Sequence, residues 1–194
     1  MDEVRCFGNT PLYIAYHDNE WGRHVRDDYK LFEMLVLEGM QAGLSWITVL
    51  NKRDAFRDAF DGFDPRKVAS YDEAQVQRLM CNEGIIRNRL KIDATITNAA
   101  RFLEITAQHG SFSRFIWQYV GNTPIVGHWN NITDIPATTP LSDRISKDLK
   151  NAGFKFVGST IIYSFMQSVG LVNDHMNSCF VYKQITDKHR QAFT

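Results

Sequence analysis

The sequence lacks an excess of either charge, because its 22 lysines and arginines balance 22 aspartates and glutamates. This balance gives no global sign of a nucleic-acid partner, although a phosphate-binding face needs only local charge. Prolines are also few, with five in 194 residues, whereas hydrophobic residues make up 44% of the chain. This composition excludes a disordered tail, a collagen-like repeat and a low-complexity linker.

The sequence also lacks long apolar runs, and it has too few cysteines, in an odd number, for a framework of disulfides. No stretch reaches the roughly 18–20 apolar residues that span a bilayer, and the N-terminus lacks the basic and apolar pattern of a secretory signal. Three cysteines are an odd number, so we expect free thiols rather than a disulfide framework. We therefore expect a cytoplasmic protein with no membrane partner and with thiols available to a metal ion.

Apolar residues that recur at three- and four-residue steps dominate from about residue 28 onward. They predict helices that begin at capping residues such as Asp27 and end near glycines such as Gly110. Alternating strand patterns are poor, and residues 121–140, which hold three of the five prolines, predict a long loop. We expect an all-α fold of seven to nine helices, with an irregular N-terminus, in a single domain over residues 1–194.

His175 and Cys179 stand four residues apart, which places both side chains on one face of a helical turn. One metal ion could then take an imidazole nitrogen and a thiolate together. Cys6 and His17 form a second sulfur–nitrogen pair, and the two pairs would complete a closed tetrahedral zinc set. Four protein ligands would make the site structural, since catalytic zinc keeps a position open. Spacing alone leaves open the alternative that His175 and Cys179 are a buried pair without a metal.

Residues 82–92 (NEGIIRNRLKI) lie between two helical patterns. A turn around Gly84 would offer backbone N–H groups at a helix start to a phosphate, and Arg87 and Lys91 would add positive charge. An ordinary corner between two helices explains the same pattern equally well. Residues 144–155 form a second basic stretch, so local charge does not choose between the two.

Seven aromatic residues crowd the first fifty positions, and most of them must belong to the core. Glu38 ends the apolar stretch 34–37, so we expect its carboxyl group to be at least partly desolvated. A carboxylate beside tyrosine and tryptophan suits a flat ligand that donates hydrogen bonds, including a cation, because aromatic faces attract cations. A surface glutamate near a helix end is the alternative interpretation.

Four segments of the sequence carry a resemblance to a known family. They are LYIAYHDNEWG at 12–22, LEGMQAGLSWITVL at 37–50, GFKFVG at 153–158 and GLVNDH at 170–175. In this order they closely resemble the type I 3-methyladenine DNA glycosylase (Tag) family, and the match extends over nearly the whole chain. The resemblance implies a helix–hairpin–helix DNA glycosylase that flips 3-methyladenine out of alkylated double-stranded DNA and hydrolyses its glycosidic bond, in base excision repair.

The resemblance also implies roles for individual residues. One structural Zn(II) would join the two ends of the chain through Cys6, His17, His175 and Cys179. The catalytic and base-binding roles fall on Glu38, Tyr16, Trp46, Trp21, Tyr13 and Ser164. The DNA contacts fall on Leu44, which would fill the hole left by the base, with Gln41 and Gly43 beside it, and on Gly84, Arg87 and Lys91 of a hairpin near residues 79–101. The segment after Cys6 is shorter than in the family, so Phe7 is not placed in the pocket.

Methylation at a ring nitrogen makes the adenine a cation, so its glycosidic bond is already weak and the base leaves as a neutral molecule. The enzyme then needs mainly to flip the nucleotide and to select the lesion. We expect Glu38, in its ionised form, and the hydroxyl group of Tyr16 to form hydrogen bonds with the edge of the base. Trp46 should stack on the face of the base. No lysine stands out as a Schiff-base nucleophile, so we expect a monofunctional enzyme that removes the base without cutting the strand. Separately, we expect the protein to be a monomer.

Two other classes of protein share parts of this pattern. A non-catalytic DNA-binding zinc module would use the hairpin and the basic stretches but would not require Glu38, Tyr16 and Trp46 together. A zinc hydrolase would need an open position on the metal. Failure to release any base from methylated DNA would favour the DNA-binding module. Base release that continues after zinc is removed would argue against a zinc hydrolase.

Overall fold

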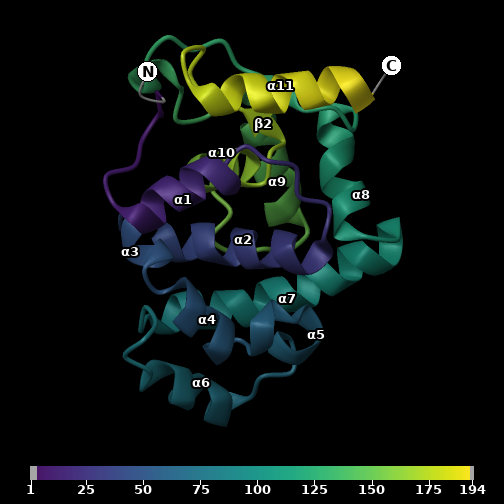
Figure 1. Ribbon diagram of the computed structural model, residues 1–194. Coiled ribbons are helices and arrows are strands. Elements are labelled where there is room, and N and C mark those ends of the chain that lie inside the picture. The colour runs from purple at the N-terminus through teal and green to yellow at the C-terminus, as the bar shows by residue number, and fades with distance from the viewer. Residues whose placement is uncertain (1–3, 193–194) are drawn as a thin grey trace.

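The computed structural model describes residues 4–192, and nearly all of its regular structure is helical (Figure 1). The longer helices are α1 (Pro11–Asn19), α2 (Asp28–Gln41), α6 (Glu73–Met80), α7 (Arg89–His109), α9 (Pro140–Asn151), α10 (Ser159–Ser168) and α11 (Phe180–Ala192). The shorter ones are α3 (Trp46–Leu50), α4 (Arg53–Ala59), α5 (Pro65–Val68), α8 (Phe112–Trp117) and the 3-10 turns η1 (Asp61–Phe63), η2 (Gln118–Val120) and η3 (Ile132–Asp134). Two-residue strands β1 (Ile125–Val126) and β2 (Val172–Asn173) pair in parallel.

Side-chain caps fix the helix starts that the sequence predicted. Asp27 Oδ1 accepts a hydrogen bond from Lys30 N at 2.8 Å at the start of α2. Asn88 Oδ1 accepts one from Lys91 N at 3.1 Å at the start of α7, and Gly110 ends that helix with a φ of +82°. A mostly helical architecture is therefore confirmed.

Three local predictions differ from the structure. Residues 11–19 form α1 instead of an irregular segment. The 121–140 loop contributes β1, and the described residues contain eleven α-helices where seven to nine were expected. Proline at the first position and the Thr10 cap explain α1, and both signals are visible in the sequence.

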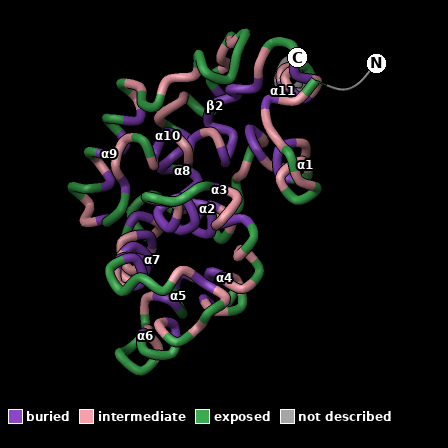
Figure 2. The backbone as a smooth tube through the Cα atoms, turned by 90° about the vertical axis from the view of Figure 1, so that its left-hand side faces the viewer, coloured by how far each residue is buried: buried purple, intermediate pink, exposed green. Residues whose placement is uncertain are grey.

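Helix α2 runs through the middle of the fold, between α1 and α10 on one side and α4 and α7 on the other (Figure 1). Ten consecutive residues from Leu31 to Met40 are buried, and Figure 2 shows this burial along the length of the helix. A helix that is packed on all sides normally carries only apolar residues. Glu33 and Glu38 therefore stand out. Glu33 has an ion pair with Arg57 at 2.8 Å.

The N-terminal segment lies against the C-terminal one at the end of the molecule where α11 lies (Figure 1). Phe180 N donates to Val4 O at 3.2 Å, and the β1–β2 pair attaches the 121–140 region to the same end. This arrangement brings side chains from both ends of the sequence together. Among the helices formed by residues 4–192, none combines the length and apolarity needed to cross a membrane.

Candidate active site and metal centre

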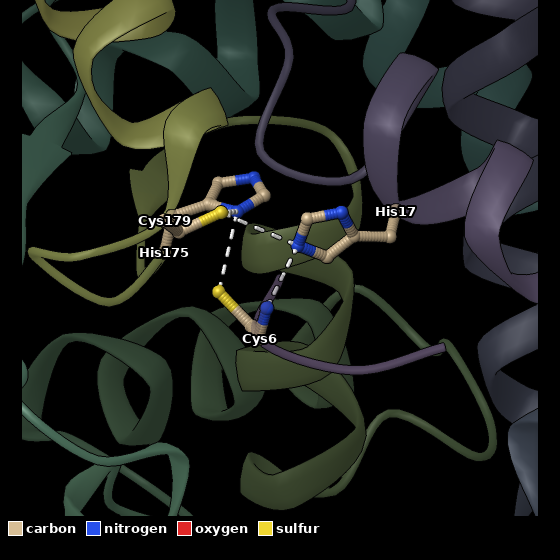
Figure 3. A group of neighbouring side chains, drawn as sticks. All are labelled: Cys6, His17, His175 and Cys179. Carbon is tan, nitrogen blue, oxygen red and sulfur yellow. Dashed lines mark hydrogen bonds between the residues drawn. The ribbon is translucent and has the colours of Figure 1, made fainter. Parts of the chain in front are cut away.

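Cys6, His17, His175 and Cys179 converge in a buried cluster between the two ends of the chain (Figure 3). One ligand atom from each residue lies within 4.8 Å of all the others. Cys179 Sγ lies 3.5 Å from both His17 Nε2 and His175 Nδ1, and Cys6 Sγ lies 3.5 Å from His175 Nδ1. The four predicted ligands are therefore brought to one point.

The donor set and its spacing fit a zinc ion. Tetrahedral zinc with Zn–S bonds of about 2.3 Å and Zn–N bonds of about 2.0–2.1 Å separates sulfur and nitrogen ligands by about 3.5 Å. The outer imidazole nitrogens are also held, because His17 Nδ1 lies 2.7 Å from Asp18 Oδ1 and His175 Nε2 lies 3.0 Å from the carbonyl oxygen of Trp21. Such outer contacts orient metal-binding histidines. A hydrogen bond shared by the two cysteines lowers the pKa of Cys179 and raises the pKa of Cys6, so the pair holds one thiolate and one thiol without a metal.

A cavity of about 170 Å³ opens between α1, α2, α3 and α10. We call it the aromatic cavity; its lining residues are Phe7, Tyr13, Tyr16, Trp21, Glu38, Gln41, Trp46, Ser164 and Gln167. All six residues predicted for the pocket are among them. The rings of Tyr16 and Trp46 lie 5.3 Å apart between centroids, and the indole nitrogen of Trp46 is buried without a hydrogen-bond partner among the described residues. The cavity therefore has flat aromatic walls, and one wall residue carries a buried N–H group without an acceptor among the described residues.

Glu38 supplies the only carboxyl group in this lining and is 4% exposed. Burial raises its pKa to about 8, and a hydrogen bond with Ser168 opposes the rise only in part. The carboxyl group is therefore largely protonated at neutral pH in the ligand-free protein, whereas the sequence prediction of an ionised Glu38 concerns the state in which the base is bound. The pKa of Tyr16 is raised by burial and then by the charge of Glu38, so its phenol keeps its proton and can donate.

The sequence missed two residues of the aromatic cavity. Phe7 lines it after all, with its ring 4.8 Å from that of Tyr13 and 4.9 Å from that of Trp21. Its position directly after Cys6 was the available signal, and the short spacing concealed it. Gln167 is held by Asp174, which accepts a hydrogen bond from Gln167 Nε2 at 2.9 Å. No local pattern marks this glutamine.

A second cavity of about 160 Å³ shares Glu38, Gln41 and Ser164 with the aromatic cavity. The α2–α3 loop (residues 42–45) borders it. Gly43 has a φ of +78°, which glycine adopts without strain, and the Leu44 side chain next to it is 43% exposed. The three residues predicted around the hole left by a base, Gln41, Gly43 and Leu44, thus all line this second cavity.

The α6–α7 turn (residues 81–88) carries the remaining predicted DNA contacts. The amide of Gly84 donates to Asn82 Oδ1 at 2.8 Å, inside the turn. Arg87 is half-exposed, with Glu83 at 3.6 Å. Lys91 is buried instead, and its Nζ donates to two backbone carbonyls of α2 and the following loop. Its ammonium group therefore does not face solvent as a phosphate contact requires.

Comparisons with known proteins agree with this arrangement. A family model described as methyladenine glycosylase matches residues 6–182. DNA-3-methyladenine glycosylase 1 of Escherichia coli (strain K12) is 54% identical over 182 residues, which cover 94% of this chain and 97% of that protein. A crystal structure of 3-methyladenine DNA glycosylase I (TAG) matches with a TM-score of 0.88 at 53% identity, covering 91% of this chain and 98% of the other. A variant of 3-methyladenine DNA glycosylase I (TAG) in complex with 3-methyladenine matches with a TM-score of 0.89 at 37% identity, covering 93% and 97%.

The raised pKa of Glu38 leads to a pH-dependent effect on stability. A carboxyl group with a pKa of 4.5 when unfolded and about 8 when folded stabilises the fold less and less as the pH rises between these values. The full difference corresponds to about 5 kcal/mol. We expect Glu38→Gln to gain several kcal/mol relative to the unsubstituted protein between about pH 5 and pH 8, measured by urea unfolding.

Glu33→Gln provides the matched control, because Glu33 lies on the same buried helix but is paired with Arg57. This variant should not show the same gain. A free-energy difference between Glu38→Gln and the unsubstituted protein that stays constant with pH would contradict the burial of an unpaired carboxyl group.

Proposed function

The chain belongs to the methyladenine glycosylase family, and we propose that its aromatic cavity holds the flipped base while the glycosidic bond breaks. The protein is a monofunctional DNA-3-methyladenine glycosylase of base excision repair. The observation that carries the proposal for the cavity is the buried carboxyl group of Glu38, which no cation pairs among the described residues. A cationic base would supply the missing charge.

The chemistry of the cavity wall matches the edge and the face of adenine. The exocyclic amine of adenine donates hydrogen bonds, and its ring nitrogens accept them. Glu38 accepts from the amine, and the phenol of Tyr16 donates to a ring nitrogen. Trp46 covers a face of the base, where its π-electrons favour a cation. A cationic base would pair with Glu38 once that carboxyl group is ionised, whereas an unmodified adenine is neutral and would leave Glu38 protonated without an ion pair. The cavity thereby selects the methylated base.

Bond cleavage requires little acid catalysis in this scheme. The bond between C1′ and the ring nitrogen breaks, its electron pair returns to the cationic ring, and the base departs as a neutral molecule. Water adds its hydroxyl group to C1′ and releases a proton. As the cationic base enters, its charge lowers the pKa of Glu38 and favours the ionised form, which then holds the base while the positive charge passes from the ring to the sugar.

We further propose that the cysteine–histidine cluster binds one structural Zn(II). The spacing of its ligand atoms and the contacts of the outer imidazole nitrogens support this assignment. Two cysteines and two histidines fill a tetrahedral ion completely, which disfavours a zinc hydrolase. The metal would supply a cross-link between the chain ends. Because such a cross-link would join both ends of the chain, we propose one glycosylase domain over residues 1–194. We also propose that the protein acts as a monomer. A cytoplasmic location would keep its thiols reduced.

Double-stranded DNA would meet the protein at the mouth of the cavities. The exposed Leu44 side chain at this mouth supports a role as the wedge that fills the hole left by the flipped base. The α6–α7 turn joins two helices as a helix–hairpin–helix element does, and the half-exposed Arg87 offers a charge to a phosphate there.

Cysteine substitutions test the zinc assignment. We expect about one zinc per chain by elemental analysis, and we expect Cys179→Ala to lower both the zinc content and the thermal stability. Turnover by the fraction that stays folded should change less than stability does. Cys81→Ala is the control, because Cys81 is exposed and outside the cluster. Unchanged zinc content in Cys179→Ala would refute the assignment.

A charge-removing substitution tests the docking of DNA. Arg87→Ala should weaken binding to all duplex sequences alike and should reduce the salt dependence by about one counterion. The measurement is duplex affinity at several salt concentrations, with Lys147→Ala measured in parallel. If the salt dependence changes only in Lys147→Ala, the 144–155 stretch on α9 is the docking face instead.

Glu38→Gln tests the reading of the base. The amide keeps the shape of the side chain but loses the charge and one acceptor, and a hydrogen bond to a charged partner is worth about 1.5–3 kcal/mol. Single-turnover excision of 3-methyladenine should therefore fall about tenfold to a hundredfold. Affinity for undamaged duplex should stay the same, because phosphate contacts lie elsewhere. Unchanged excision, or an equal loss of both quantities, would place the base outside the aromatic cavity.

A further inference from the structure

Lys91 is a buried lysine in the first turn of α7, with 7% of its surface exposed. Its Nζ donates hydrogen bonds to the carbonyl oxygen of Met40 at 2.8 Å and to that of Ala42 at 2.7 Å. These acceptors stand 51 and 49 residues earlier in the chain. Lysine is almost never fully buried unless it is paired, so the two carbonyls are the partners that hold it there.

Both carbonyls lie where the chain leaves α2. The last carbonyls of an α-helix have no partner within the helix, and Lys91 supplies one from another helix. Directly after them the chain turns through Gly43, and Leu44 N donates to Gln41 O at 2.6 Å. The exposed Leu44 side chain therefore projects from a turn whose base is fixed by Lys91.

The charge of Lys91 suits this position. No carboxylate forms an ion pair with Lys91 among the ion pairs of residues 4–192. Its ammonium group instead lies at the C-terminal end of α2, where the helix dipole favours a cation. Burial lowers the pKa of Lys91. The adjoining cavity measures only about 10 Å³. This is about the room of a single water molecule, so the space beside the Lys91 side chain is small.

The segment 155–156, which lies beside the same small cavity, is also held by hydrogen bonds. Asn98 holds the backbone of Lys155 through two hydrogen bonds, with Nδ2 donating to Lys155 O at 2.9 Å and Lys155 N donating to Oδ1 at 2.7 Å. The next residue, Phe156, has a φ of +53° and lines the small cavity together with Lys91 and Gly39. This segment belongs to the GFKFVG block, whose residues had no site role among the sequence predictions. Lys91 and Phe156 thus line the same small cavity beside the end of α2.

We propose that Lys91 is a positioning residue for Leu44: it fixes the end of α2 so that the leucine points out of the protein in the orientation that enters the duplex. This inference rests on the proposed wedge role of Leu44. Lys91 would contact neither the base nor a phosphate. Because it joins α7 to the end of α2, it would also keep the wedge in register with the α6–α7 turn.

Lys52 provides a matched control for the chemistry of the contact. Its Nζ also donates to two backbone carbonyls, of Glu83 at 3.0 Å and of Gly84 at 3.2 Å. Those carbonyls lie in the α6–α7 turn and not at the end of α2. Lys52→Met and Lys91→Met therefore remove the same kind of group, but only the second removes it from the base of the wedge.

The experiment is a double-mutant cycle between Lys91→Met and Leu44→Ala, read out by single-turnover excision from methylated duplex DNA. Lys91→Met should lose about tenfold to a hundredfold in rate, because small misplacements have effects of that size. Its affinity for free 3-methyladenine should change less than about twofold, which shows that the aromatic cavity is folded. In the Leu44→Ala background, Lys91→Met should cost little more. Lys91→Arg, which keeps the charge and two donors, should restore most of the rate.

Each outcome decides a separate point. Additive losses from Lys91→Met and Leu44→Ala, or full activity of Lys91→Met alone, overturn the positioning role while leaving the wedge intact. Full activity of Leu44→Ala overturns the wedge and the positioning role together. Lys52→Met should act additively with Leu44→Ala. If Lys91→Met does not fold, Lys91→Gln replaces it, because its amide is too short to reach both carbonyls, and the same cycle decides.

Discussion

A carboxyl group loses its hydration when α2 carries Glu38 into the core, and no cation replaces that hydration among the described residues. Glu33, on the same helix, shows the usual solution, since Arg57 pairs with it. Leaving Glu38 unpaired makes the free protein less stable at neutral pH than a paired carboxylate would. The same deficit gives a cationic base an advantage over a neutral one. The aromatic walls add contact area without adding a competing charge.

The end of α2 connects three parts of the proposed mechanism. Glu38 lies two residues before Met40, whose carbonyl binds Lys91, and Leu44 follows shortly after. One stretch of backbone at the end of α2 therefore carries the residue proposed to bind the base, the carbonyl groups that bind Lys91, and the residue proposed to fill the hole in the duplex. The cysteine–histidine cluster contacts the wall of the aromatic cavity, because His175 Nε2 lies 3.0 Å from the carbonyl oxygen of Trp21, which lines that cavity. This contact connects the cysteine–histidine cluster directly to a residue that shapes the aromatic cavity.

Local signals were sufficient for much of the fold and of the site. Caps such as Asp27 and the glycine after α7 located helix ends, and the apolar run before Glu38 indicated its desolvation. The resemblance to the family indicated the residues of the aromatic cavity and the four side chains of the cysteine–histidine cluster. Three features were beyond such signals, because each depends on segments that meet only in three dimensions. The pKa of Glu38 follows from complete burial, Gln167 is placed by Asp174, and Lys91 finds its acceptors about fifty residues away.

The protonation state of Glu38 is the quantity that tests this account most directly. Carboxyl ¹³C NMR of protein labelled at glutamate, with Glu38→Gln used to assign the signal, gives the titration of this one group. The account predicts an apparent pKa of about 8 in the free protein and a lower value when DNA carrying a cationic base analogue is bound. A pKa near the ordinary 4.5 in the free protein would contradict it, because Glu38 would then be hydrated or paired and would have no special preference for a cation.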